Sequence, residues 1–344
     1  VFKQTAPVIK LPEGAAVEDH LNLLAVLNTS VACFWLKHIS KPKGGAAERS
    51  WSRTYEFTGT NLKDFPLPAS TPIDLASRLD DLAIDLQRES PAEVARRDTP
   101  TSAALESART ESGRLRSLMI ALQEEMDWQY YRIYGLIDED LTFDGEVTGI
   151  AFGERAFEVA LARKIESGEE TTAWFEQHGS TPVTEIPAHL PTDYRDLIQR
   201  RLDAIASNPN IRLLEKPEYK RRWAMEPWDK QVESALRGWL LDRVEDRSLW
   251  FDREGRPTPH SVAQLADLLD RDADRRLAGR RLRGQHQRQA GQLLEVAVGR
   301  ATRHRADRTH AAIRLVGTTL VEDHLARRLL GAREERAEHR AIRA

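Results

Sequence analysis

The chain has 344 residues, of which 40% are hydrophobic and 31% are charged, so it is long enough to bury a core in two or three units of ordinary domain size. No apolar run approaches the roughly 18 to 20 residues that a membrane-spanning helix needs, and the single Cys33 excludes an internal disulfide. The first residues, which begin with Val1 rather than Met, contain no signal-peptide pattern. We therefore expect a cytoplasmic protein whose sequence starts within a longer one.

The formal net charge of -3 conceals an uneven distribution along the chain. Residues 271–344 contain 18 Arg against nine Asp and Glu, and they contain no Lys and no aromatic residue. All eight Trp and the last lysine, Lys230, precede them. Two explanations stay open: a shifted reading frame in GC-rich DNA, which enriches Arg, Ala, Gly and His, and a natural basic arm for nucleic acid.

The first elements in chain order are short and varied. Apolar residues at helical spacing predict one amphipathic helix over residues 21–35. A basic, glycine-containing loop at Lys41–Arg49 follows, and the alternation of bulky and polar residues predicts a strand at Trp51–Phe57. The prolines of Phe65–Pro68 end this unit, because neither can continue a helix or donate to a strand ladder.

Two long helices are expected next. Thr71 is the predicted N-cap of the first helix, with Pro72 in its first turn. Leucines recur there at steps of three and four, at Leu75, Leu79, Leu82 and Leu86. After a polar break at residues 89–101, a second seam at similar spacing runs from Leu115 to Ile133. We expect the two helices to pack antiparallel with their apolar stripes in contact.

A third unit is expected from about residue 148 to 256, with helices over residues 154–166, 194–207 and 230–246. Five of its aromatic residues lie close together in sequence: Trp223, Trp228, Trp239, Trp250 and Phe251. They are most simply the aromatic core of a small domain. The alternative is a platform on which unpaired bases stack, and exposure decides between the two.

Catalytic motifs are absent from the sequence. It has no Gly-rich cofactor loop, no Asn-Pro-Pro-aromatic turn for a flipped adenine, no Walker lysine loop and no G-x-S-x-G. His304, His310 and His324 have neither Cys partners nor the spacing of a zinc site, so we expect no metal. The acidic pairs Glu124-Glu125 and Asp138–Asp140 are predicted to be solvated helix ends. We expect this chain alone to be catalytically inactive.

The basic loop is the best functional candidate that residue spacing alone provides. Six cationic residues fall within 17 positions there, with two tryptophans flanking or among them, which is a common composition for surfaces that contact DNA phosphates and base edges. The candidate DNA-binding residues are Trp35, Lys37, His38, Lys41, Lys43, Arg49, Trp51 and Arg53. A run of charges is also typical of an ordinary solvated surface, and that alternative stays open.

Several segments resemble known families. The L-x-x-L-N-T helix at residues 24–29, the Phe65–Pro68 segment and the acidic-aromatic run at residues 123–136 resemble the end of the target-recognition domain in fused restriction-modification methyltransferases. The segments Gly153–Phe157, Pro217–Trp223 and Ala235–Asp242 resemble the C-terminal region of PglX-type methyltransferases of phage growth limitation and BREX phage-exclusion systems. The resemblance runs from about Leu21 to Leu269 and ends near Asp270.

The resemblance implies S-adenosylmethionine as methyl donor and adenine N6 in double-stranded DNA as acceptor, with the base flipped from the stack. It places the catalytic features before Val1. The expected fold is mainly α: residues 1–70 end an α/β target-recognition lobe, residues 71–147 form a helical spacer, residues 148–269 form a Trp-rich helical domain, and residues 270–344 are a tail.

Three functions follow as hypotheses. The first is a non-catalytic DNA-recognition and scaffold portion of a phage-defence or restriction-modification adenine methyltransferase. The second is a subunit that completes a methyltransferase in trans with a separately encoded catalytic chain. The third is a coiled-coil adaptor that binds other proteins only, such as further phage-defence components.

Overall fold

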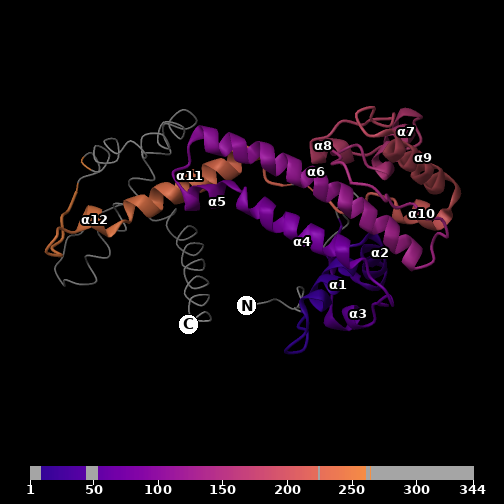
Figure 1. Ribbon diagram of the computed structural model, residues 1–344, viewed down its shortest axis with the longest axis horizontal. Coiled ribbons are helices and arrows are strands. Elements are labelled where there is room, and N and C mark those ends of the chain that lie inside the picture. The colour runs from indigo at the N-terminus through magenta and orange to yellow at the C-terminus, as the bar shows by residue number, and fades with distance from the viewer. Residues whose placement is uncertain (1–8, 44–52, 224, 261–263, 265–344) are drawn as a thin grey trace.

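The computed structural model describes residues 9–43, 53–223, 225–260 and 264 (Figure 1). Within this part of the chain it has twelve helices and one two-stranded sheet, which confirms the predicted mainly α class. The predictions for Arg49, Trp51 and the Arg-rich tail lie outside the described residues. No helix in the described ranges is both long and apolar enough to span a bilayer.

The N-terminal unit contains two helices where the sequence predicted one: α1 (Val17–Leu27) and α2 (Ser30–Ile39). The helix is interrupted at Asn28 and Thr29. Their short polar side chains form hydrogen bonds with the local backbone, which compete with continuation of the helix. Asn28 Nδ2 donates to the carbonyl of Leu24 at 2.7 Å, and Thr29 Oγ1 accepts from the amide of Ala32 at 3.1 Å as the N-cap of α2. The break turns α2 beneath α6 (Figure 1).

A β-hairpin and a short helix complete this unit. Strand β1 (Lys41–Lys43) pairs antiparallel with β2 (Thr54–Glu56), with Lys41 opposite Glu56. Of the predicted strand at residues 51–57, the structure describes residues 53–57 and has a strand at Thr54–Glu56. The helix α3 (Gly59–Lys63) follows, and Phe65 is buried against α2 and α4.

The long helices pack as the leucine spacing indicated. Helix α4 (Ile73–Arg88) starts at Ile73 with Pro72, rather than the expected Thr71, at the N-cap position. Helix α6 (Ser102–Ile133) has 32 residues and runs along the long axis of the molecule beside α4 (Figure 1). The two are antiparallel, because Leu75 and Leu79 share a cluster with Met126, whereas Ser112 Oγ donates to the carbonyl of Glu89 at 3.3 Å.

Two groups of helices pack at opposite ends of α6 (Figure 1). At its N-terminal end lie α5 (Pro91–Arg97), which falls in the expected polar break, α11 (Trp228–Val244) and α12 (Arg247–Trp250). At its C-terminal end lie α7 (Ala156–Glu166), α8 (Trp174–His178), α9 (Thr192–Ser207) and α10 (Pro209–Leu214).

The predicted single aromatic core of residues 223–251 is wrong. Trp223 is buried in the main cluster at the C-terminal half of α6, together with residues of α7, α9 and α10. Trp239 is buried in a separate cluster with Leu105 of α6 and Val94 of α5, and Trp228 and Trp250 pack on that second cluster. Trp223 and Trp228, although only five residues apart in sequence, therefore pack in different clusters along α6.

Candidate nucleic-acid interface and the charge cluster beneath it

The structure separates the predicted DNA-binding residues into an inner and an outer set. Trp35 packs edge-on against Phe65, with ring centroids 5.3 Å apart, and so contributes to the packing of the N-terminal unit. Lys41 and Lys43 are exposed on β1, and Arg53 is exposed just before β2. These three cations of the hairpin project from a short, regular element, whereas Arg49 and Trp51 lie outside the described residues.

Lys37 joins the two sides of this surface. Its ammonium group donates a hydrogen bond to the carbonyl of Glu218. It also lies 5.6 Å from the ring centroid of Tyr55 on β2 and 5.9 Å from that of Tyr219, distances at which a cation is attracted to the aromatic face. Lys37 is thus a half-buried bridge between the hairpin and the residues around 218, rather than a free surface cation.

The segment Pro217–Trp223 lies directly on α2. Cys33 Sγ is 3.8 Å from the carbonyl oxygen of Glu218, and the rings of Phe34 and Tyr219 meet edge to face with centroids 5.1 Å apart. His38 is exposed and its ring lies over that of Phe34 at 4.1 Å. The sequence placed this segment in the family resemblance, and its Trp223 in an aromatic group that is either a core or a base-stacking platform, but not in the basic interface.

The signal that could have added this segment to the candidate interface is its composition. Its run Tyr219-Lys220-Arg221-Arg222 has the basic and aromatic character that singled out residues 35–53.

Lys220 is the centre of a buried charge cluster under this surface. Its side chain has no exposed area, and its Nζ lies 2.9 Å from Asp127 Oδ2, 2.8 Å from Glu215 Oε1 and 3.1 Å from Glu124 Oε1. Asp127 also accepts hydrogen bonds from the amide and hydroxyl of Ser30, at 2.8 and 2.7 Å. One ammonium group therefore ties α6 to the segment that carries Tyr219, and Asp127 ties both to α2.

Two buried arginines extend the cluster on either side. Arg155 at the start of α7 forms a two-pronged pair with Glu158, with Nε and Nη2 donating at 2.9 and 2.8 Å, and its Nη1 donates to the carbonyl of Arg221 at 2.9 Å. Arg201 of α9 pairs with Glu125 at 2.6 Å. Buried guanidinium groups are tolerated when they are paired with a carboxylate and hydrogen-bonded in this way. The cluster links α6, α7, α9 and the segment Pro217–Trp223.

The carboxylates outnumber the cations in the cluster, and this sets the direction of the pKa shifts. Burial raises the pKa of Glu124 to about 7, against the lowering effect of Lys220. Burial lowers the pKa of Lys220, but Asp127, Glu124 and Glu215 outweigh it, so that its pKa is raised. Because five acidic side chains face three basic ones here, protonation of Glu124 brings the cluster closer to neutrality.

The structure overturns the prediction that Glu124 and Glu125 are solvated. Each is 2% exposed, and all ten residues from Met119 to Trp128 are buried. The acidic turn Asp138–Asp140, in contrast, is exposed as predicted. The distinguishing signal in the sequence is position, because Glu124 and Glu125 lie inside the predicted seam from Leu115 to Ile133, whereas the turn lies beyond its end, after Gly135.

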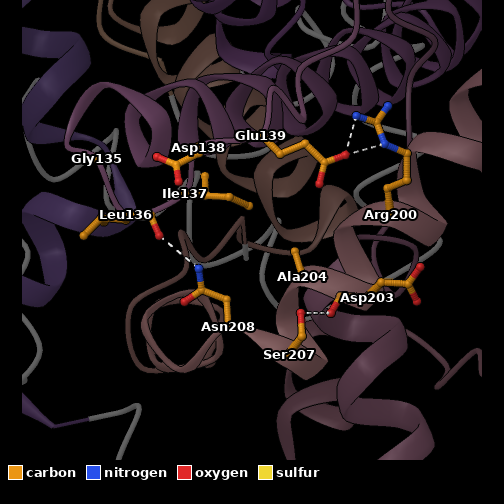
Figure 2. A pocket seen from close by; sticks show the side chains of 10 residues that line it. All are labelled: Gly135, Leu136, Ile137, Asp138, Glu139, Arg200, Asp203, Ala204, Ser207 and Asn208. Atoms are coloured by element: carbon orange, nitrogen blue, oxygen red, sulfur yellow. Dashed lines mark hydrogen bonds and ion pairs between the residues drawn. The ribbon is translucent and has the colours of Figure 1, made fainter.

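An open cavity of about 460 Å³ lies between the acidic turn and the C-terminal half of α9 (Figure 2). Its polar groups are largely bonded to one another: Arg200 pairs with Glu139 at 2.7 Å, and Asn208 Nδ2 donates to the carbonyl of Leu136 at 3.0 Å. These contacts hold the turn against α9. The lining residues contain no paired nucleophile and base, so the cavity indicates no catalytic centre.

The described residues do not fit an S-adenosylmethionine site. Such sites need a glycine-rich turn between a strand and a helix, where the backbone approaches the cofactor closely. The sheet in the described ranges has only two three-residue antiparallel strands, and the glycines with positive φ there lie in turns such as Gly153 before α7 and Gly179 after α8. The same ranges also lack any group of three His, Cys, Asp or Glu side chains that could hold a metal ion.

Comparison with known proteins gives the cluster a family context. A family model described as a domain of unknown function, DUF7008, matches residues 119–303, which is more than half of the chain. The chain belongs to the DUF7008 family. The DUF7008 match starts at Met119, where the fully buried part of α6 begins, and contains all eight charged members of the cluster, including Lys220. It also passes Asp270, where we expected the resemblance to end.

The chain is 52% identical over 287 residues to an adenine-specific methyltransferase PglX from Streptomyces coelicolor. The alignment covers 79% of this chain and 24% of the relative, so the chain spans about a quarter of the length of the protein it matches. The predicted kinship with PglX-type proteins is thereby confirmed. No solved structure matches the chain.

Proposed function

We propose that this chain is the DNA-recognition and scaffold portion of a site-specific DNA adenine-N6 methyltransferase of a BREX-like phage-defence or restriction-modification system. The observation that carries the proposal is the hairpin with exposed Lys41, Lys43 and Arg53, mounted on a rigid helical body in a chain similar to PglX. In this proposal the chain positions DNA, and the catalytic residues and S-adenosylmethionine site belong to other parts of the enzyme.

The geometry of the hairpin suits contact with phosphates. Lys41 and Lys43 are two residues apart on β1, so their side chains leave the same face of the strand. Exposed lysines on a regular element bind a polyanion by releasing its counterions, which gives affinity and register without base choice. The proposal therefore predicts salt-dependent binding to duplexes of any sequence, with sequence choice supplied elsewhere in the recognition lobe.

The test is the salt dependence of duplex affinity for the full chain and for the triple variant Lys41→Ala/Lys43→Ala/Arg53→Ala. Each lost phosphate contact reduces the slope of log K against log salt by about 0.9. The triple variant should therefore lose about 2.7 units of slope if all three contact phosphates. Arg109→Ala, an exposed arginine on the N-terminal half of α6, is the matched control. Equal slopes for all three proteins would refute the DNA contact.

The two other hypotheses make different predictions. Completion of a methyltransferase in trans requires activity when the chain is coexpressed with a catalytic chain, and an inactive pair refutes it. A coiled-coil adaptor requires an apolar seam offered to a partner, but Leu75, Leu79, Leu82 and Leu86 of α4 are packed against the cores formed with α6. A steep salt slope for DNA binding would also contradict a protein-only adaptor.

A further inference from the structure

We infer that the segment Pro217–Trp223 forms the second half of the DNA-contacting surface, with Arg221 and Arg222 contacting the phosphate backbone of the same duplex as the hairpin. This inference rests on the proposed function and deepens it. It adds cations that lie more than 160 residues after the hairpin in sequence and within the DUF7008 match. The partner to which it commits is double-stranded DNA.

The first step of the argument is that the two halves are neighbours. Lys37 contacts the Tyr55 ring of β2 and the Tyr219 ring at 5.6 and 5.9 Å, so one side chain spans the gap between them. The pKa of Tyr219 is raised chiefly by burial, and Tyr55 adds to this effect, which also requires their proximity. The hairpin, Lys37 and the segment Pro217–Trp223 are therefore continuous.

The second step is that the interior of the protein dictates which side chains of this segment face outward. Lys220 is buried and paired with three carboxylates. Trp223 is buried in the main hydrophobic cluster. Between these two anchors Arg221 and Arg222 are both exposed. Burying Lys220 costs desolvation that only its carboxylate partners offset, so the outward orientation of the two arginines is fixed by the charge cluster.

The third step concerns how these arginines are held. Arg221 Nη1 donates to Asn28 Oδ1 at 2.8 Å, and its guanidinium lies 4.5 Å from the ring centroid of Trp223. Arg222, the next residue, is exposed. A guanidinium stacked on a ring, as that of Arg221 is, is held in a fixed planar fork, which suits phosphate oxygens.

The fourth step is the charge of the resulting surface. It contains Lys41, Lys43 and Arg53 from the hairpin and Arg221 and Arg222 from the distant segment, with Lys37 at the junction. Glu56, which faces Lys41 across the hairpin, and Glu218, whose carbonyl accepts a hydrogen bond from Lys37, also lie on this surface. Exposed cations interleaved with tyrosines favour a polyanion as partner.

The experiment measures duplex affinity against salt for the full chain and for Arg221→Ala/Arg222→Ala. We expect the slope to fall by about 1.8 units, which corresponds to roughly 60-fold weaker binding at 0.1 M salt, equally for unrelated duplexes. Arg221→Lys/Arg222→Lys keeps both charges and should restore the slope. The control is Arg109→Ala/Lys230→Ala, which removes two exposed cations near the other end of α6, with Arg109 about 27 Å along the helix from Asp127.

The outcomes separate this inference from the proposed function. If the hairpin variant loses slope and Arg221→Ala/Arg222→Ala behaves like the control, the composite surface is overturned and the hairpin contact stands. Loss in the arginine variant alone overturns the hairpin as the DNA contact and with it the composite surface. If the unaltered chain does not bind duplex DNA, both are overturned. If the salt slope falls in Arg221→Ala/Arg222→Ala and also in Arg221→Lys/Arg222→Lys, the cause is altered folding rather than lost charge. That result counts against the inference.

Discussion

Replacement of Lys220 by methionine tests the central physical claim of the structure, that one buried ammonium group holds three carboxylates together. Methionine has a similar length and fits an apolar site, so the change removes the charge and little volume. Asp127, Glu215 and Glu124, whose oxygens lie 2.8 to 3.1 Å from Nζ, would lose their shared cation inside the protein. The variant isolates the charge from the packing.

The expected loss is large. Removing one partner of a buried ion pair costs about 3 to 5 kcal/mol, because the remaining charge stays buried without compensation. The loss should also depend on pH. Lys220 is what lowers the pKa of Glu124 against burial, so the pKa of Glu124, already about 7, moves higher without it. A carboxyl whose folded pKa is raised stabilises the fold below its unfolded pKa, and this contribution is lost as the pH rises through the folded value. The variant should therefore be weakest at high pH and recover on acidification.

The assay is urea denaturation followed by tryptophan fluorescence at about pH 6 and about pH 8.5, on either side of the folded pKa of Glu124. Lys216→Met, a chemically identical change at an exposed lysine four residues earlier, is the control. Combining Lys220→Met with Glu124→Gln should return part of the lost stability, because one uncompensated carboxylate is removed with the cation. A loss below about 1 kcal/mol, the value of an exposed ion pair, or equal losses at the two pH values would refute the reasoning.

Two further predictions concern Glu124 and the turn before α7. Glu124→Gln removes a carboxyl whose pKa is raised to about 7. Between about pH 5 and pH 8 the unaltered chain should therefore lose on the order of 3 kcal/mol more unfolding free energy than the variant. Denaturation midpoints measured across that range test this, and parallel pH curves for the two proteins would contradict it. Gly153 has φ +92 and a built Cβ would lie 2.8 Å from the carbonyl oxygen of Thr181, whereas Gly168 has φ +77 and open space around it. Gly168→Ala should lower the stability of the fold by the roughly 1 to 2 kcal/mol expected for backbone strain, and Gly153→Ala should lower it by more. Equal shifts in melting temperature for the two variants would show that the contact between the added Cβ and the carbonyl of Thr181 does not destabilise the fold.

The periodic helices could be predicted because each buries one stripe of its own surface. The leucines of α4 at threes and fours, and the partners they meet on α6, follow from local spacing and a short connection. The break between α1 and α2 could not be read from hydrophobicity, since the apolar stripe continues through it. It depends on whether Asn28 and Thr29 bond to the backbone, which is a choice between two local conformations that differ little in energy.

The charge cluster was missed for a different reason. Apolar periodicity reports how one element is buried, but the environment of Glu124 is set by Lys220, which lies 96 positions later in sequence. An acidic pair on a helix is usually solvated. Its burial is tolerated only when a cation from another segment offsets the desolvation of the carboxylates. The same reason explains why the sequence indicates only part of the proposed DNA surface. Its hairpin half is contiguous in sequence, whereas Arg221 and Arg222 join it only through the fold.

The same cluster bears on how the chain divides. The expected boundary at residue 147 separates Lys220, Arg155 and Arg201 from Asp127, Glu124 and Glu125, and the boundary at residue 70 separates Ser30 from Asp127. A fragment beginning at residue 148 would leave Arg201 without Glu125 and Lys220 without Asp127 and Glu124, and burying cations with fewer partners is costly. Since the outward orientation of Arg221 and Arg222 depends on Lys220 being buried, the candidate DNA surface requires α6 as well as the segment that carries the arginines. The charge cluster therefore crosses both expected boundaries, and the proposed DNA contact depends on residues from both sides of them.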